Sequence, residues 1–145
     1  MKAVSMLLGL FLVVSVVTIS GCSDNSPHTY YVGNSTFQLQ GEWGQVYAIN
    51  ATVMSRVKLD NSARYLQVVK YNDQEQYLLD YAKAKEHYAV NTTEISGIRV
   101  IGINTGINKF LYYFEKNGQG YSVDTEGFTE NNVMKDLDNI ISTLT

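Results

Sequence analysis

The stretch that decides the fold covers residues 109–124, KFLYYFEKNGQGYSVD. Two β-favouring segments, 109–115 and 121–124, flank the polar segment 116–120, in which Asn117 and Gly118 are adjacent. Asn-Gly between two β segments is a strong hairpin signal, because both residues tolerate the positive φ angles of a tight turn. The chain is therefore expected to fold back on itself here and to build an antiparallel sheet.

Further segments with β-favouring or alternating apolar side chains extend this sheet on both sides of the hairpin. Strands are predicted at residues 30–32, 36–40, 46–59, 65–71, 92–96 and 98–103, with turns or bends at 41–44, 60–62 and 104–106. Gly97, between the last two strands, marks a bulge or a tight turn.

Two segments change to helical periodicity. The first, residues 74–88, follows Asp73 as N-cap, and Gln76 stands three residues later as in a capping box. Its core-facing side is expected to carry Tyr77, Leu78, Tyr81, Ala82 and Lys85. The second, residues 130–144 with Thr129 as cap, has one apolar stripe: Val133, Leu137, Ile140, Ile141 and Leu144. The element order predicts a single α+β domain over residues 29–145, an antiparallel β-sheet flanked by helices.

This layout resembles the Mog1/PsbP-like fold, which includes small prokaryotic lipoproteins. The features that carry the resemblance are FQLQGEWG (37–44) with Trp43 at the bend, the helix DQEQYLLDYAKAKEHY (73–88), the hairpin FLYYFEKNGQGYSV (110–123) and the closing helix VMKDLDNIISTL (133–144). Glu42 occupies the position before the tryptophan where that family usually has proline. The resemblance implies an α/β/α sandwich that binds proteins or assists membrane complexes. The family shares no single catalytic set, so the resemblance implies no active-site residue.

The N-terminus has the pattern of an export signal. Lys2 precedes an apolar run over residues 6–19, which is typical of a secretory signal peptide and too short to span a bilayer comfortably. The run ends at Ile19-Ser20-Gly21-Cys22, which resembles the lipobox of prokaryotic lipoproteins, with Ile19 in place of the usual leucine. That resemblance implies that residues 1–21 are removed and that Cys22 receives a diacylglyceryl group.

The alternative is a plain signal peptide cut near Gly21, which would leave an ordinary thiol. Cys22 is the only cysteine of the chain, so it has no partner for an internal disulfide, and a lone thiol is unfavourable in an oxidising compartment. Two acyl chains on one cysteine would anchor the protein stably, since each buried methylene contributes about 0.8 kcal/mol. The expected location is therefore the cell membrane, with the domain facing outside the cytoplasm.

Residues 22–28 are polar, contain the only proline, Pro27, and are expected to form a short tether between lipid and domain. The net charge is −3, and it becomes more negative when Lys2 is removed. A negative charge argues against nucleic acid as a partner and against electrostatic docking to anionic lipid.

The sequence carries no catalytic or metal-binding signature. His28 and His87 are the only histidines, and neither has a second ligand nearby at zinc spacing. There is no Gly-x-Ser-x-Gly motif, so an enzyme is the least favoured class and no cofactor is expected. The acidic segments 124–127 and 136–138 lack the twelve-residue calcium loop and are interpreted as a turn and a solvated helix face.

Three asparagines, Asn34, Asn50 and Asn91, fit the glycosylation acceptor pattern, which has meaning only in a host that glycosylates exported proteins. The tyrosine content, 11 residues, is unusually high. In the neighbouring pairs 30–31 and 112–113 one tyrosine of each pair should face outward, because successive strand residues point to opposite faces. Exposed tyrosines suit contacts with partners or sugars, although tyrosine also favours the half-buried surface of a sheet.

Two functions follow from these features. The first is a non-enzymatic binding or accessory module for a membrane or envelope complex, because the chain has an anchor and a short tether but no catalytic groups. The alternative is a receptor for an apolar or sugar-like small ligand, held between sheet and helix and lined by Tyr77, Tyr81 and the aromatic residues of the later strands.

Overall fold

The computed structural model describes residues 25–145; the predicted signal peptide and lipobox, with Cys22, lie outside the described residues. The elements are β1 (Pro27–Val32), β2 (Ser35–Gln40), β3 (Gly44–Asn50), β4 (Met54–Asn61), β5 (Arg64–Tyr71), α1 (Gln74–His87), β6 (Val90–Ile95), β7 (Ile98–Gly106), β8 (Lys109–Lys116), β9 (Gln119–Glu126) and α2 (Glu130–Thr143). Neither of these two helices is long and apolar enough to cross a membrane.

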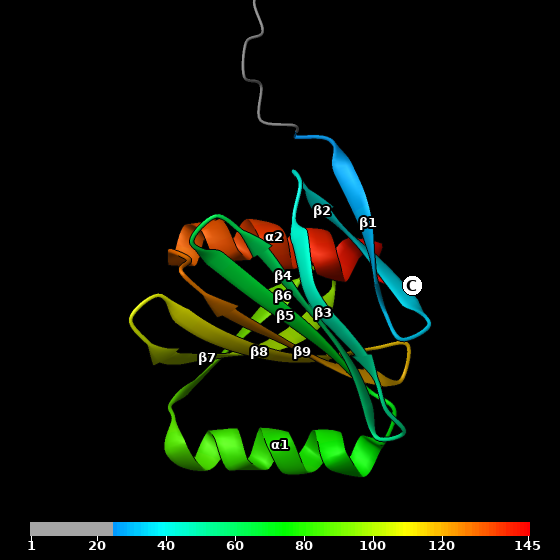
Figure 1. Cartoon of the computed structure of the whole chain (residues 1–145). Helices are drawn as coiled ribbons and strands as arrows, with labels where there is room; N and C mark the ends of the chain where they lie inside the picture. The colour runs from blue at the N-terminus through cyan, green and yellow to red at the C-terminus, as the bar shows by residue number, and fades with distance from the viewer. Residues whose placement is uncertain (1–24) are drawn as a thin grey trace, which may run out of the picture.

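Seven strands form one sheet in the order β3-β4-β5-β9-β8-β7-β6, and β1 and β2 form a separate two-stranded hairpin (Figure 1). All pairings are antiparallel. After β5 the chain crosses to the far edge of the sheet through α1 and then returns by hairpins, so that β9 lies beside β5. The prediction of an α+β domain with an antiparallel sheet is confirmed.

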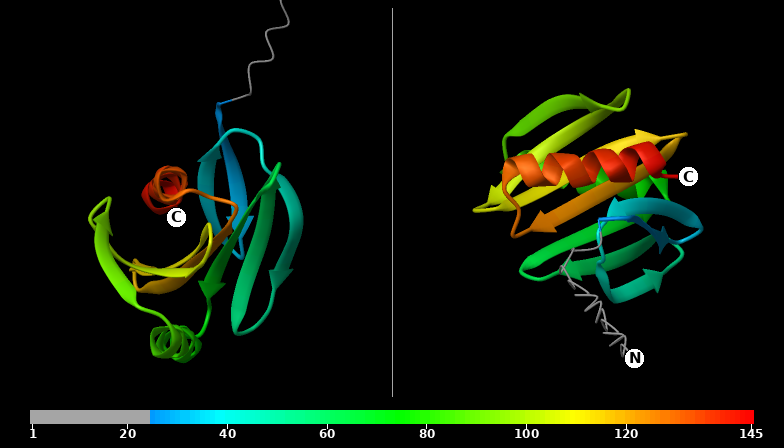
Figure 2. Two further views of the ribbon diagram at one scale, coloured as in Figure 1. Left: turned by 90° about the vertical axis from the view of Figure 1, so that its left-hand side faces the viewer. Right: turned by 90° about the horizontal axis from the view of Figure 1, so that it is seen from above.

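The two helices cover opposite faces of the sheet, α2 above and α1 below in Figure 1. The larger core lies on the α2 side, where the sheet curves around that helix and the β1–β2 hairpin closes the layer (Figure 2). A smaller core lies on the α1 side and consists of Val69, Tyr71, Tyr77, Ile101, Ile103 and Tyr113. The unequal cores leave α1 with much less buried apolar surface than α2.

The predicted Asn-Gly hairpin is confirmed. Asn117 and Gly118 have φ angles of 54° and 74°, as the mirror-image turn of a two-residue hairpin requires, and they connect β8 to β9. The tight turn at Gly97 is confirmed in the same way, with φ angles of 50° at Ser96 and 76° at Gly97.

The predicted turn at residues 104–106 is wrong. The strand β7 continues through Gly106 by way of an irregularity, and the Asn104 side-chain oxygen accepts a hydrogen bond of 3.0 Å from the Gly106 N–H. The chain turns after β7 instead, where Asn108 has a φ of 54°. This side-chain bond takes up the Gly106 N–H where the register of β7 with β8 is irregular.

The predicted strand 46–59 is also wrong, because the chain turns at residues 51–53 and forms two strands, β3 and β4. The Ala51 N–H donates to the Met54 carbonyl at 3.0 Å. The carbonyl of Val53 accepts from the N–H groups of Asn72 and Asp73, at 2.8 and 3.2 Å. These donors lie about twenty positions later in the chain, so the sequence around residues 51–53 does not by itself predict the turn.

Both helices begin where the sequence predicts. Asp73 caps α1, since its side-chain oxygen accepts from the Glu75 N–H at 2.9 Å. The capping box is not completed, because the side chain of Gln76 donates to Asp80 instead, at 2.7 Å. Thr129 is the N-cap residue of α2, although its side chain makes no capping bond. The five stripe residues of the closing helix are all buried, so that prediction is confirmed.

The boundary between tether and domain differs from the prediction. The strand β1 begins at Pro27, so Pro27 and His28 belong to the domain, and the Gly41 N–H donates to the carbonyl of Ser26 at 3.1 Å. Tyr31 is 65% exposed, as expected for one member of its pair. Tyr112 and Tyr113 are both buried, against the prediction, because β8 is an interior strand covered from both sides.

Candidate functional site

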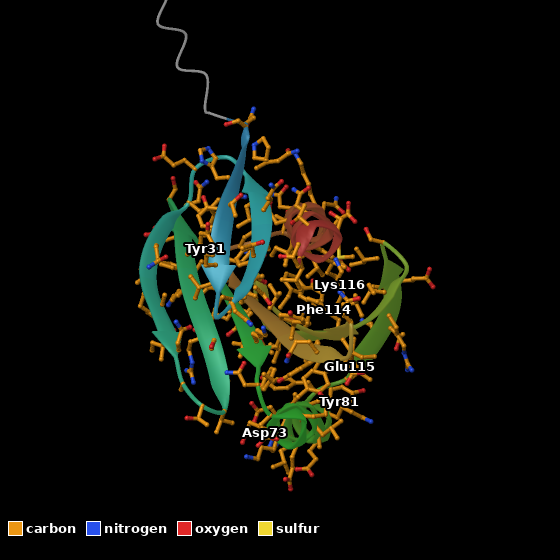
Figure 3. The ribbon with its side chains drawn as sticks, turned by 90° about the vertical axis from the view of Figure 1, so that its right-hand side faces the viewer. Tyr31, Asp73, Tyr81, Phe114, Glu115 and Lys116 are labelled. Atoms are coloured by element: carbon orange, nitrogen blue, oxygen red, sulfur yellow. The ribbon has the colours of Figure 1, made fainter. Side chains whose placement is uncertain are left out.

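A groove of about 350 Å³ lies between α1 and the sheet. It is lined by Tyr77, Leu78, Tyr81, Arg99, Ile101, Tyr113, Phe114 and Glu115. Figure 3 shows Tyr81 on α1 near Glu115 on β8, on the other side of the picture from Tyr31. The structure therefore brings together Tyr77 and Tyr81, the two helix residues expected to line a ligand site, with Tyr113 from the later strands.

Tyrosine rings form the floor of this groove. The ring centroids of Tyr71 and Tyr77 are 5.4 Å apart, those of Tyr77 and Tyr113 are 6.0 Å apart, and those of Tyr81 and Tyr113 are 5.6 Å apart. These edge-on and tilted arrangements are the favourable ones for aromatic pairs. The four rings attach α1 to β5 and β8.

Gly120 determines how closely α1 approaches the sheet. A methyl group on Gly120 would lie 2.6 Å from Cγ and 2.7 Å from Cδ2 of Tyr77, so the tyrosine ring rests directly on the backbone of β9. Glycine is the only residue that allows this contact without displacement of the helix.

The face of α1 that meets the sheet is narrower than predicted. Tyr77 is buried, and Tyr81 and Ala84 are half-buried against the core. Leu78 is 54% exposed, and Ala82 and Lys85 are exposed as well, so the prediction of a core face that includes them is wrong. Tyr77, Tyr81 and Ala84 occupy the space under the helix, and Leu78 beside them lies at the edge of the groove.

The rim of the groove carries charges of both signs. Arg99 and Glu115 flank the paired residues Val100 and Phe114 on neighbouring strands. Within the described part of the chain, the Arg99 guanidinium makes no hydrogen bond or ion pair, whereas the Glu115 carboxylate accepts from Gln74. On the helix side, Lys85 Nζ lies 5.1 Å from the centroid of the Tyr81 ring.

The tyrosine hydroxyls remain protonated at neutral pH. Burial is the main cause that raises the pKa of Tyr113 to about 12, and burial also raises the pKa of Tyr77. Both groups are therefore hydrogen-bond donors rather than bases under physiological conditions.

The remaining residues singled out from the sequence are not brought together. His28 lies in β1 within 3.4 Å of Ser26, whereas His87 ends α1 on the other side of the sheet. Among residues 25–145, no group of three or more His, Cys, Asp or Glu side chains could hold a metal ion. The three glycosylation asparagines are exposed: Asn34 follows β1, Asn50 ends β3 and Asn91 lies in β6.

Two polar features had no recognisable sequence signal. Lys70 is only 8% exposed, and its ammonium donates to Asn34 and, at 3.0 Å, to Ser35, whose hydroxyl is 3.1 Å from that of Tyr121. This network connects β2 to β5 and β9. Because Ser35 is buried, its hydroxyl is not presented to solvent as a nucleophile.

The second feature corrects the interpretation of residues 136–138 as a solvated helix face. Asp136 is 7% exposed, and its carboxylate lies 3.9 Å from Arg64, which also covers the stacked rings of Trp43 and Phe128. Burial raises the pKa of Asp136, and Arg64 acts in the opposite direction.

No protein-family model matches the chain, and neither does any curated protein sequence. The groove and its surroundings therefore provide the basis for a functional proposal.

Proposed function

We propose that the protein is a lipoprotein held outside the cytoplasm by lipid on Cys22, and that its domain is a non-enzymatic binding module. The proposed docking surface for a partner protein is the α1 surface, defined as the groove together with the outward-facing Leu78, Leu79, Ala82 and Lys85. The partner is a component of a membrane or envelope complex.

The observation that carries this proposal is the exposure of two leucine side chains on α1 beside the groove. Leu78 and Leu79 are 54% and 50% exposed, and Tyr88 and Val90, just beyond the helix, are also exposed. Single exposed apolar residues are ordinary on protein surfaces. Here they adjoin an aromatic groove and a second, shallower hollow of about 510 Å³ over Leu78, Tyr81, Ala82, Lys85 and Glu86. An apolar centre with a charged rim is the usual anatomy of a protein interface.

The position of α1 relative to the anchor supports the same role. The strand β1, where the described chain begins, is on the α2 side of the sheet, and α1 is on the opposite side (Figure 1). Residues 22–26 can span at most roughly 18 Å, so lipid on Cys22 would keep the domain close to the bilayer. The α1 surface would then face away from the attachment point and stay open to a partner.

The fold that we propose for the domain is the Mog1/PsbP-like α/β/α sandwich. The bend at Trp43, one helix on each sheet face and the hairpin at Asn117-Gly118 are consistent with that assignment. Members of that family bind proteins or assist membrane complexes, which agrees with a role in docking.

Site-specific photocrosslinking in cells tests the proposal on the native, lipid-bearing protein. A photoreactive residue at Leu78 or Ala82 should capture one or two discrete membrane partners. The same residue at Ser142, exposed on α2, provides the matched control and should capture neither. Identical products from all positions, or no discrete product from α1, would contradict the proposed surface.

A substitution separates docking from folding. Leu78→Lys should change the free energy of unfolding by no more than about 0.5 kcal/mol, because the side chain is half exposed. It should nevertheless abolish the capture from Ala82. Tyr31→Lys, which alters an exposed residue of β1 away from the α1 surface, should leave capture unchanged.

A receptor for an apolar small ligand in the same groove is the alternative function. The volume of about 350 Å³ and the lining by Tyr77, Tyr81 and Tyr113 favour it, since small-ligand sites occupy about 300–1,000 Å³ and are mostly apolar and aromatic. A ligand present at 100 times its dissociation constant would stabilise the fold by about 2.7 kcal/mol. A thermal-shift screen in which no apolar compound stabilises the protein would count against this alternative.

A further inference from the structure

A second cleft, of about 330 Å³, lies on the other face of the sheet, between the beginning of α2 and strands β6 to β8. It is lined by Asn91, Thr93, Gly102, Ile103, Asn104, Phe110, Tyr112, Glu130 and Met134. Tyr112 belongs to the core on the α2 side, whereas Tyr113 belongs to the core under α1, so the cleft is separated from the α1 surface by the sheet. We propose that this cleft binds one ring of a neutral carbohydrate.

The floor of the cleft is aromatic. Phe110 and Tyr112 are two residues apart in β8 and point to the same face. Their ring centroids are 6.4 Å apart and their planes differ by 23°, so the two rings lie nearly parallel to each other. Phe110 is only half-buried, which leaves part of its ring open to a ligand. Such a surface suits the C–H face of a sugar ring.

Gly102 holds this floor in place. It is the register partner of Tyr112, and a methyl group on Gly102 would lie 3.2 Å from Cε1 of the Tyr112 ring. The tyrosine ring therefore rests closely on the backbone of β7. The floor is rigid before any ligand arrives, which lowers the entropic cost of binding.

The rim of the cleft provides polar groups that have no partner. Asn91 and Thr93 are exposed and lie on the same face of β6, and their side chains make no hydrogen bond within the described part of the chain. Asn91 pairs with Gly102, which pairs with Tyr112, so the amide stands at the end of a row that leads to the aromatic floor. Glu130, the first residue of α2, provides a carboxylate from the opposite wall.

The Tyr112 hydroxyl is a further donor at this site. Within residues 25–145 it has no hydrogen-bond partner, and it is not sealed from solvent despite the burial of the ring. Burial, followed by the neighbouring Glu130 carboxylate, raises the pKa of Tyr112 to about 12. The hydroxyl therefore keeps its proton at neutral pH and can donate to a ligand oxygen.

The chemistry of the lining identifies the ligand class. A purely apolar ligand would remove Asn91, Thr93 and Glu130 from water without replacing their hydrogen bonds, which is unfavourable. An anionic ligand would meet the Glu130 carboxylate, and no Lys or Arg lines the cleft. A neutral ring with one apolar face and several hydroxyl groups pairs with both the floor and the rim.

The test uses the mature, lipid-bearing protein in a detergent without a sugar headgroup. Amide chemical shifts are followed by NMR while glucose, galactose, mannose and N-acetylglucosamine are added separately, each to tens of millimolar. At least one of the four should produce saturable shifts confined to the amides of Asn91, Thr93, Gly102 and Tyr112. No saturable shift with any of them, or shifts centred on Tyr77 and Tyr81, would overturn the proposal.

Matched variants connect the binding to the cleft. Thr93→Val should weaken the binding of that sugar by about fivefold, since it removes one rim hydroxyl and keeps the side-chain shape. Thr92→Val, one residue earlier and on the opposite face of β6, should leave the affinity unchanged. Equal effects of the two variants, or no effect of Thr93→Val, would overturn the assignment of this site. Neither outcome bears on partner docking at the α1 surface.

Discussion

The contact between Gly120 and Tyr77 makes a sharp prediction about how α1 is attached. In Gly120→Ala, the new methyl group would lie 2.6 Å from Cγ, 2.7 Å from Cδ2 and 3.1 Å from Cβ of Tyr77. Because even Cβ of the tyrosine is too close, rotation of the ring does not relieve the conflict. The helix itself has to move away from β9.

The cost follows from this geometry. Overpacking of a well-packed core costs about 1–3 kcal/mol. Replacing glycine in a compatible strand conformation returns about 0.4–1 kcal/mol through the unfolded chain. We therefore expect a net loss of about 1–2 kcal/mol. Gly106→Ala is the matched control, because its methyl group would lie no closer than 3.6 Å to a side-chain atom, and it should be neutral or slightly stabilising.

Urea unfolding followed by far-ultraviolet circular dichroism measures both changes, and hydrogen exchange reports on α1. Gly120→Ala should speed the exchange of the α1 amides. The fluorescence of Trp43, the only tryptophan and a member of the core on the α2 side, should remain native. In the background of Tyr77→Ala, the cost of Gly120→Ala should fall by at least about 1 kcal/mol. An unchanged cost in that background, or equal stability of the two glycine variants, would refute the proposed seating of α1.

Three further predictions concern other parts of the chain. Asp136→Asn should be at least as stable as the wild type at pH 7, because burial raises the pKa of Asp136 and its charged form is disfavoured in the folded state. The difference in melting temperature between variant and wild type should shrink as the pH falls to about 4, because the wild-type carboxyl then becomes neutral. A constant or reversed difference would contradict this prediction. Cys22→Ser should abolish the incorporation of a labelled fatty acid into the protein, whereas continued labelling would contradict lipid on Cys22. Gly118→Ala should cost roughly 1–2 kcal/mol in urea unfolding, because alanine is unfavourable at a φ of 74°, and no loss would show that the turn adapts.

Local chemistry was sufficient to predict the elements whose signals lie within a few residues. The Asn117-Gly118 turn, the Asp73 cap and the apolar stripe of α2 depend on backbone conformation and helical spacing alone, and all three are confirmed. The strand 46–59 was wrong because its interruption depends on hydrogen bonds from Asn72 and Asp73. Such bonds exist only after β5 has returned alongside β4.

The groove under α1 was also predictable from the sequence only in part. The sequence identified Tyr77 and Tyr81 as residues of a helix that packs on aromatic strands, and the structure places both in the groove. It did not indicate that Leu78 would be exposed, because the orientation of α1 is decided by the contact between Tyr77 and Gly120, 43 positions apart in the chain.

The sequence by itself determined the fold class, the first residue of both helices and the tight turns at Gly97 and at Asn117-Gly118, whereas export and lipid anchoring stay predictions. Only the tertiary structure decided which faces remain open. Strand order brings Asn91, Gly102 and Tyr112 into one row, and it covers both Tyr112 and Tyr113 by making β8 an interior strand. The physical reason is that turns and caps depend on neighbouring residues, whereas burial depends on which distant strands and helices pack against a side chain.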